Sequence, residues 1–272
     1  QAAANSRMAS SYLRALDLLG PVLVRAPLPF SRITSIWSID SIPLLADLYA
    51  YILDQQRLGD AGIFAGHPSP SYADNGFYSA ALRNYRDFLI VEQHQRRLWE
   101  QYRAAPADPH DLGRRLDDQP LEYADLLAAD LDPTDRTGRD VLRTVKTRVN
   151  QDFFRAMVLD NYGHRCCLTG IPIPAVLRAS HIVPWSEDEA NRLNPANGLC
   201  LSATYDAAFD AHLISFDEDL RMIIGPILLE CGQDNAVKKS FSSLAGISIK
   251  KGLRYEPDQL LMAKHRSIMH AS

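Results

Sequence analysis

Four segments decide the fold of this chain: Cys-Cys-Leu-Thr-Gly (166–170), Ser-His-Ile-Val-Pro-Trp (180–185), Asn-Pro-Ala-Asn-Gly-Leu-Cys-Leu (194–201) and Tyr-Asp-Ala-Ala-Phe-Asp (205–210). Short apolar pieces in and around them, separated by Gly and Pro, predict strands at Cys167 to Thr169, Leu177 to His181 and Gly198 to Ser202. The stretch from Ala203 to Ala211 predicts a helix directly after the last of these strands. The sequence therefore predicts a hairpin, a loop and a helix in close succession.

The four segments resemble the HNH endonuclease superfamily, the ββα-metal nucleases, and within it the restriction-type branch with the pattern SHIxPW…NGLxL…FD. The resemblance covers about residues 148–220, and Leu261 to Arg266 is similar to a terminal helix that often follows this domain in restriction-type proteins. It implies a metal-dependent endonuclease that hydrolyses DNA phosphodiester bonds with one divalent ion, Mg²⁺ or Mn²⁺. It further implies a restriction or antiviral defence role in a bacterial cytoplasm. The expected partner is double-stranded DNA, and the possibility that the protein forms a homodimer is left open.

The motif residues also suit this chemistry on physical grounds. Hydrolysis needs a base that takes the proton of the attacking water, and a cation that stabilises the developing charge. His181 follows a predicted strand and precedes Pro184, so its ring can be fixed at the edge of the hairpin, where a neutral imidazole has a suitable pKa for a base. Asn197 precedes Gly198 in a turn, and its amide can bridge the loop and hold the strand that carries His181. We predict His181 and Asn197 as catalytic residues, Asn197 largely through a structural role.

The predicted metal ligands are Asp206, Asp210 and His181. The two aspartates are four residues apart and share one face of a helix, and their hard oxygens suit Mg²⁺ or Mn²⁺. Two positions depart from the family pattern. Ser180 stands where a carboxylate often precedes the first motif His, and the third motif position, usually His, falls on Tyr205 or Asp206. We favour Asp206 as the ligand and keep Tyr205 as a catalytic candidate near the scissile phosphate, or as a packed side chain.

The predicted DNA contacts are Arg165, Arg178 and Arg192, which lie close to the motif segments and can hold phosphates, although each alone is also an ordinary surface residue. The net charge is −4 and the isoelectric point is near 6.1. A protein that binds DNA without sequence preference is usually basic overall. Any DNA-binding face must therefore be local and built from scattered residues.

The fold class that we expect is α+β, with a helical N-terminal domain over residues 8–138 and the nuclease domain with a C-terminal extension over residues 139–272. Residues 104–120 and 130–138 are rich in Pro, Asp and Arg and predict exposed connections. A long helix from Val141 to Tyr162 opens the second domain. The first domain has no comparable motif, and we assign it recognition or dimerisation. Apolar residues at helical spacing predict its helices at Ser10–Leu19, Ile42–Leu53, Ser71–Leu89 and Leu121–Leu131.

The cysteine pattern favours a reduced, cytoplasmic chain, because Cys166, Cys167, Cys200 and Cys231 form no CxxC pair. Cys166, Cys167 and Cys200 could bind zinc, with His164 as a fourth ligand. Because the sequence has no pair of CxxC motifs, we do not expect a structural zinc site. No run of about eighteen apolar residues occurs, so we expect no membrane-spanning helix and no membrane partner.

Two other functions stay open. A non-catalytic DNA-binding module that retains a degenerate HNH fold is favoured by the departures at Ser180 and Tyr205. A protein-interaction scaffold in a larger defence complex is the second alternative. Cleavage of a plasmid with Mg²⁺ or Mn²⁺ tests the first alternative, and a salt-dependent shift of duplex DNA tests the second.

Overall fold

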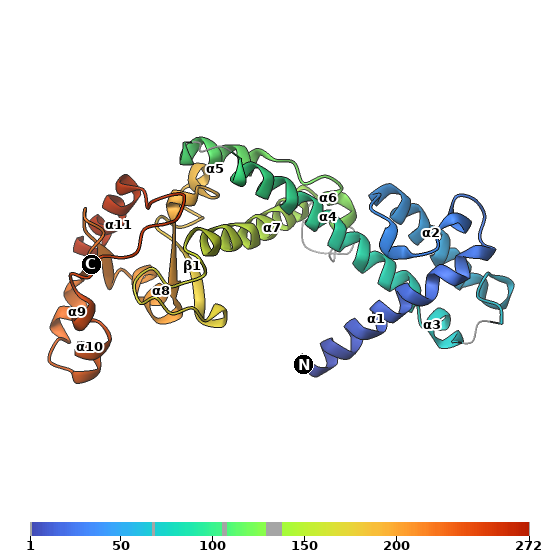
Figure 1. Ribbon diagram of the computed structural model, residues 1–272, viewed down its shortest axis with the longest axis horizontal. Helices are drawn as coiled ribbons and strands as arrows, with labels where there is room; N and C mark the ends of the chain where they lie inside the picture. The colour runs from blue at the N-terminus through green and yellow to red at the C-terminus, as the bar shows by residue number, and fades with distance from the viewer. Residues whose placement is uncertain (1, 67–68, 105–107, 129–137, 272) are drawn as a thin grey trace. The chain divides into compact units, whose positions relative to one another are not determined.

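The structure is a computed structural model that describes residues 2–66, 69–104, 108–128 and 138–271 (Figure 1). The chain divides into two compact units, and neither is one continuous stretch. The N-terminal unit combines Gln1–His94 with Leu121–Val145, and the C-terminal unit combines Gln95–Pro120 with Lys146–Ser272. This division differs from the single boundary that we expected near residue 138. No helix within the described ranges is both long enough and apolar enough to cross a membrane.

The regular secondary structure described in the N-terminal unit is helical, as predicted. Ser41 caps α2 by accepting a hydrogen bond from the Leu44 N–H, and Pro43 occupies the first turn. The expected helix at 71–89 is interrupted at Gly76, whose φ of +70° is unfavourable for other residues. The unit contains α1 (Ala2–Val22), α2 (Ile42–Leu58), α3 (Pro70–Asp74), α6 (Ala124–Ala128), parts of α4 (Phe77–Arg103) and α7 (Gly138–Asn161), and 3-10 helices at Leu23–Arg25, Phe30–Arg32, Ile36–Ser38 and Gly59–Ala61.

The C-terminal unit contains the predicted hairpin and helix. β1 (Leu177–His181) pairs antiparallel with β2 (Gly198–Ser202), and His181 lies opposite Gly198. α8 (Ala203–Asp210) follows β2 directly and packs against both strands. The predicted strand at 167–169 is wrong, because these residues belong to a turn in which the Gly170 N–H donates to the carbonyl of Cys166.

A second small sheet and further helices complete this unit. β3 (Ile214–Phe216) pairs antiparallel with β4 (Met222–Ile224). The segment that we expected to form a terminal helix lies in α11 (Gln259–Ala271). The remaining elements are α9 (Pro226–Glu230), α10 (Asn235–Ser240) and 3-10 helices at Pro174–Val176, Glu189–Asn191, Pro195–Asn197 and Ser242–Leu244.

Residues 109–118 form a helix, α5 (Pro109–Asp118), which corrects our expectation of an exposed connection at 104–120. The Asp108 side chain accepts a hydrogen bond from the Asp111 N–H and caps the helix. Leu112 and Leu116 share one face and are buried in the core of the C-terminal unit. The other predicted connection, at 130–138, lies outside the described residues apart from its last residue, as does the end of the helix predicted at 121–131.

Three of the four cysteines fill this core. Cys166, Cys167 and Cys200 are buried with free thiols, whereas Cys231 is exposed. Burial raises the pKa of Cys200 to about 12 and that of Cys167 well above its ordinary value. The two thiols are therefore neutral at neutral pH and pack as small apolar groups.

Candidate active site

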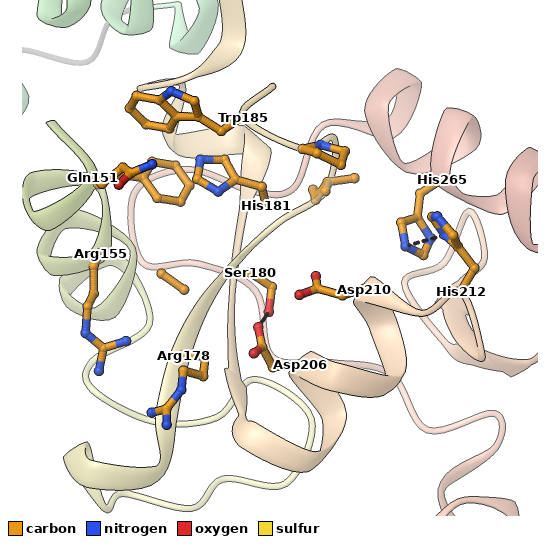
Figure 2. A pocket seen from close by; sticks show the side chains of 14 residues that line it. Gln151, Arg155, Arg178, Ser180, His181, Trp185, Asp206, Asp210, His212 and His265 are labelled. Atoms are coloured by element: carbon orange, nitrogen blue, oxygen red, sulfur yellow. Dashed lines mark hydrogen bonds between the residues drawn. The ribbon is translucent and has the colours of Figure 1, made fainter. Parts of the chain in front are cut away.

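A pocket of about 570 Å³ lies in the C-terminal unit and is lined by residues of α7, β1 and α8 (Figure 2). Three of the predicted reactive residues line it: His181 from the end of β1, and Asp206 and Asp210 from α8. The side chains of Ser180 and Asp206 meet at its wall, and Asp210 lies between them and His212. The structure thus brings the predicted base and the two predicted carboxylate ligands to one pocket.

His181 is held between two aromatic rings. Its imidazole stacks on Phe154 of α7 with 3.7 Å between ring centroids and 10° between planes. The ring of Trp185 meets it edge-on at 5.6 Å. This burial lowers the pKa of His181 to about 4, so the imidazole is neutral at neutral pH and able to accept a proton.

The proton of the neutral ring is placed by a backbone carbonyl. His181 Nε2 lies 3.3 Å from the carbonyl oxygen of Arg192. Because a carbonyl oxygen only accepts, Nε2 must carry the hydrogen and donate it. Nδ1 is then the nitrogen with the free lone pair, and it is the one that can act as a base.

Asn197 is fully buried and ties the loop together behind His181. Its Oδ1 accepts from the Val183 N–H at 2.9 Å, and its Nδ2 donates to the carbonyl of Val183 at 3.1 Å and to that of Asn191 at 3.0 Å. The geometry matches the bridging role that we predicted for its amide. Asn197 therefore fixes the backbone that follows His181 and has no side-chain surface left to reach a substrate.

The two aspartates of α8 lie in different environments. Asp206 accepts a hydrogen bond from the hydroxyl of the buried Ser180 (Figure 2). The pKa of Asp210 is raised by burial and further by the negative charge of Asp206. A cation bound by both carboxylates would relieve this repulsion.

The donor set of Asp206 and Asp210 fits Mg²⁺ or Mn²⁺, which proteins commonly hold with one or two carboxylates while water and phosphate oxygens fill the other positions. Across the described ranges, no three His, Cys, Asp or Glu side chains cluster closely enough to hold an ion by themselves. His181 is thus not gathered with the two aspartates into a three-ligand cluster, and its predicted role as a ligand stays a prediction.

Three other predicted site residues do not line the pocket. The Tyr205 hydroxyl donates to the carbonyl of Ser240 at 2.8 Å, and its ring packs against Phe241. Arg192 donates to the carbonyl of Trp185 and pairs with Glu189, so it braces the loop. Arg165 is exposed and donates to the carbonyl of Gly170. Of the two alternatives that the sequence left open for Tyr205, its contacts agree with the packed side chain.

Among the polar residues that line the pocket, sequence reasoning missed Gln151, Arg155, His212 and His265. Gln151 and Arg155 are four residues apart on α7, and Arg155 and the predicted Arg178 of β1 both donate to the carbonyl of Leu177. The helical spacing of Gln151, Phe154 and Arg155 was visible in the sequence, but which face of α7 meets the hairpin was not. His212 and His265 share a hydrogen bond at 3.1 Å and come from segments far apart in the chain.

Replacement of Gly198 by alanine should disturb the ring of His181. Gly198 has an extended backbone with φ of −129°, which alanine also adopts. Any effect of the replacement therefore comes from steric crowding and not from backbone strain. A Cβ there would lie 2.4 Å from Cγ2 of Val158 and 3.0 Å from Cζ of Phe154, which stacks on His181. We expect a loss of about 1–3 kcal/mol in the free energy of unfolding. Urea unfolding and the NMR signals of the His181 ring measure the effect, and wild-type values for both would contradict it.

Residues 166–217 match a family model described as HNH endonuclease. The match covers the turn at 166–170, both strands of the hairpin, the loop between them and α8. No curated protein matches the chain.

Proposed function

We propose that this protein is a metal-dependent endonuclease that hydrolyses phosphodiester bonds of DNA. One observation carries the proposal: a neutral His181, with its Nδ1 lone pair free, lines the same pocket as the carboxylates of Asp206 and Asp210. The family match over residues 166–217 supports nuclease chemistry for this part of the chain.

In the proposed reaction, Nδ1 of His181 takes a proton from the attacking water. The resulting positive charge on the ring is shared with the carbonyl of Arg192 through the Nε2–H donor. Asp206 and Asp210 would hold one divalent ion, which stabilises the charge that develops on the phosphate and the leaving oxygen. Ser180 keeps one oxygen of Asp206 oriented by its hydroxyl.

The cationic side of the pocket supports a phosphate substrate. Arg155 and Arg178 line it on the side of α7 and β1, where Figure 2 shows both guanidinium groups. Each donates to backbone carbonyls, Arg155 to that of Leu177 and Arg178 to those of Ala175 and Leu177. A guanidinium has five N–H donors, so both keep donors for phosphate oxygens. We assign phosphate contacts to this pair, with Arg165 and Arg192 as outlying candidates.

The test is nicking of supercoiled plasmid DNA by the full chain with Mg²⁺ or Mn²⁺. We expect conversion to nicked and linear forms that stops when EDTA removes the ion. A protein that binds the plasmid but does not nick it with either ion would contradict the proposal.

The acid limb of the pH profile should lie near the lowered pKa of His181. The active base is the neutral ring, so cleavage requires a pH above the pKa of His181, which is about 4 rather than the ordinary 6.5. We expect kcat/KM to persist below pH 6.5 and to fall only as the pH approaches about 4. NMR titration of the His181 ring gives the same pKa independently. A limb and a ring titration both near 6.5 would contradict the assignment.

The biological setting that we propose is restriction-type defence in a bacterial cytoplasm, with double-stranded DNA as partner and recognition or dimerisation by the helical N-terminal unit. This setting rests on the resemblance of the motif segments to restriction-type HNH proteins. Digestion of modified and unmodified phage DNA by the full chain tests it. Equal cleavage of both DNAs would contradict a modification-dependent defence role.

A second candidate function is a non-catalytic DNA-binding module, favoured by the contact between Ser180 and Asp206. Ser180 stands where the family often has a carboxylate, and its hydroxyl already occupies one oxygen of Asp206. Plasmid binding without cleavage, together with retention of that binding in the presence of EDTA, would support this candidate against the first.

A further inference from the structure

His110 of α5 is wedged between the start of α11 and the loop that carries Asn197. Its Nε2 lies 2.9 Å from Oδ2 of Asp258, and its Nδ1 lies 2.9 Å from Oδ1 of Asn191. Nδ1 also lies 3.2 Å from Nδ2 of Asn194. The two asparagines are buried, whereas the His110 side chain is 45% exposed.

The orientation of both asparagine amides is fixed by their other partners. Oδ1 of Asn194 accepts from the Ala196 N–H at 2.8 Å, so its Nδ2 is the group that donates to Oδ1 of Asn191 at 2.7 Å. Nδ2 of Asn191 in turn donates to Asp188 at 2.8 Å. The atom of Asn191 that faces His110 is therefore an oxygen, which can only accept.

Both ring nitrogens of His110 thus face acceptors, one a carboxylate and one an amide oxygen. A neutral ring has a hydrogen on one nitrogen only, so it loses the hydrogen bond to one of these two oxygens, and a bare Nδ1 can instead accept only the longer hydrogen bond from Nδ2 of Asn194 at 3.2 Å. Only the imidazolium donates to both partners. The charged groups facing it from the packed elements are Asp258, before α11, and Asp108, at the start of α5, with Asp188 behind Asn191.

The pKa of His110 agrees with this geometry. Burial opposes protonation, but the hydrogen bonds to Asp258 and Asn191 and the charges of Asp258 and Asp108 outweigh it and raise the pKa above the ordinary 6.5.

The contacts of His110 continue to His181 through one loop. The carbonyl of Asn191 accepts from the Asn197 amide, which binds Val183 on both its N–H and its carbonyl. The next residue, Arg192, supplies the carbonyl to which His181 Nε2 donates. A shift of this loop would therefore move both the backbone after His181 and the group that places the proton of its ring.

α5 is docked on the loop at backbone distance. A Cβ on Gly113 would lie 2.8 Å from both Cα and N of Asn194, so only glycine lets the helix approach this closely. Asp258 ties the start of α11 to the same loop, because its N–H donates to the carbonyl of Ala196 at 2.9 Å. α5, the loop and the start of α11 therefore meet at His110, and their close contacts leave little room for one to move against another.

We propose that protonated His110 is a positioning residue that clamps the loop from Asp188 to Asn197 between α5 and α11 and thereby holds His181 in its reactive orientation. The effect on catalysis rests on the proposed nuclease function, whereas the clamp itself does not. Loss of the proton at alkaline pH breaks one of the two hydrogen bonds and loosens the loop.

The first experiment is an NMR titration of the full chain, labelled to report the protonation of histidine rings and asparagine amides. We expect the ring of His110 to titrate with a midpoint above 6.5, and both of its nitrogens to be protonated below that midpoint. The Asn191 and Asn197 amide signals and the His181 ring signals should shift with the same midpoint. A His110 midpoint at or below 6.5, or Asn197 and His181 signals that do not change with its titration, would overturn the proposal.

The second experiment is the alkaline pH profile of plasmid cleavage with Mg²⁺ or Mn²⁺. Wild type should lose kcat, with KM little changed, as His110 deprotonates. His110→Gln should lower kcat by up to about 10²-fold at neutral pH and lack this limb. Asp258→Asn keeps an acceptor for the N–H groups at the start of α11 but removes the charge, so the limb should move to lower pH. The control His270→Gln, on an exposed face of α11, should match wild type.

The outcomes separate the two proposals. An unchanged alkaline limb in both His110→Gln and Asp258→Asn overturns the positioning role even if the plasmid is cleaved. If wild type cleaves no DNA, the proposed function fails, and the titration alone then decides whether His110 clamps the loop and orients His181.

Discussion

Replacement of His181 by alanine is expected to slow plasmid cleavage by about 10²–10⁴-fold, the usual loss when a general base is removed. In the proposed reaction Nδ1 of His181 takes the proton of the attacking water, and burial lowers the pKa of the ring so that it is unprotonated at neutral pH. Single-turnover nicking with Mg²⁺ or Mn²⁺ measures the loss. Cleavage by His181→Ala at nearly the wild-type rate would end the assignment.

The control for this variant has two parts. Removal of the ring also removes its stack on Phe154, so urea unfolding must show that the C-terminal unit still folds. DNA affinity at matched salt should change little, because His181 is proposed to act on water and not on the phosphate charge. His270→Ala, an exposed histidine of the same unit, should cleave like wild type.

Replacement of Asp206 by asparagine should cost cleavage on the order of 10²-fold or more, because charge stabilisation by a divalent ion is worth several kcal/mol. Asparagine has nearly the same shape and can still accept from Ser180, so the change removes charge more than structure. The measurement is the dependence of nicking on Mg²⁺ and Mn²⁺ concentration. We expect half-maximal nicking to require a higher concentration of Mg²⁺ or Mn²⁺. We also expect the maximal rate of nicking to be lower.

The matched control is Tyr205→Phe, one residue earlier on α8. It removes the hydrogen bond to the Ser240 carbonyl and should cost about 1 kcal/mol in the free energy of unfolding, with little effect on cleavage. If Tyr205→Phe proves more damaging to cleavage than Asp206→Asn, the alignment of the third motif position to Asp206 is wrong by one residue.

The sequence predicted the local elements of the site well. The bounds of β1 and β2 agree with the expected strands, and α8 ends one residue before the expected helix end. These elements are short and bounded by Gly, Pro and Asn, so their limits depend on neighbouring residues. Asn197 could also be assigned its bridge, because Asn before Gly favours a turn, where the amide can bond neighbouring backbone groups.

The helix α5 could not be predicted in this way. Its sequence is short, begins with Pro109 and contains Gly113, both of which suggest a connection. Only Leu112 and Leu116 mark its apolar face, and an isolated helix of this length is unstable in water. Packing of these two leucines against residues far along the chain stabilises it. The clamp by His110 was hidden for the same reason, since its partners Asn191 and Asp258 come from distant segments.

By itself, the sequence determined which residue types are available for the chemistry and which of them share a strand or a helix face, because these depend on spacings of a few residues. It placed His181 at the end of a strand and Asp206 with Asp210 on one helix. Only the tertiary structure decided the protonation of His181, since the ring of Phe154 and the carbonyl of Arg192 that govern it come from other segments. It also decided that Tyr205 packs away from the pocket, because both residues it contacts lie far beyond α8 in the chain.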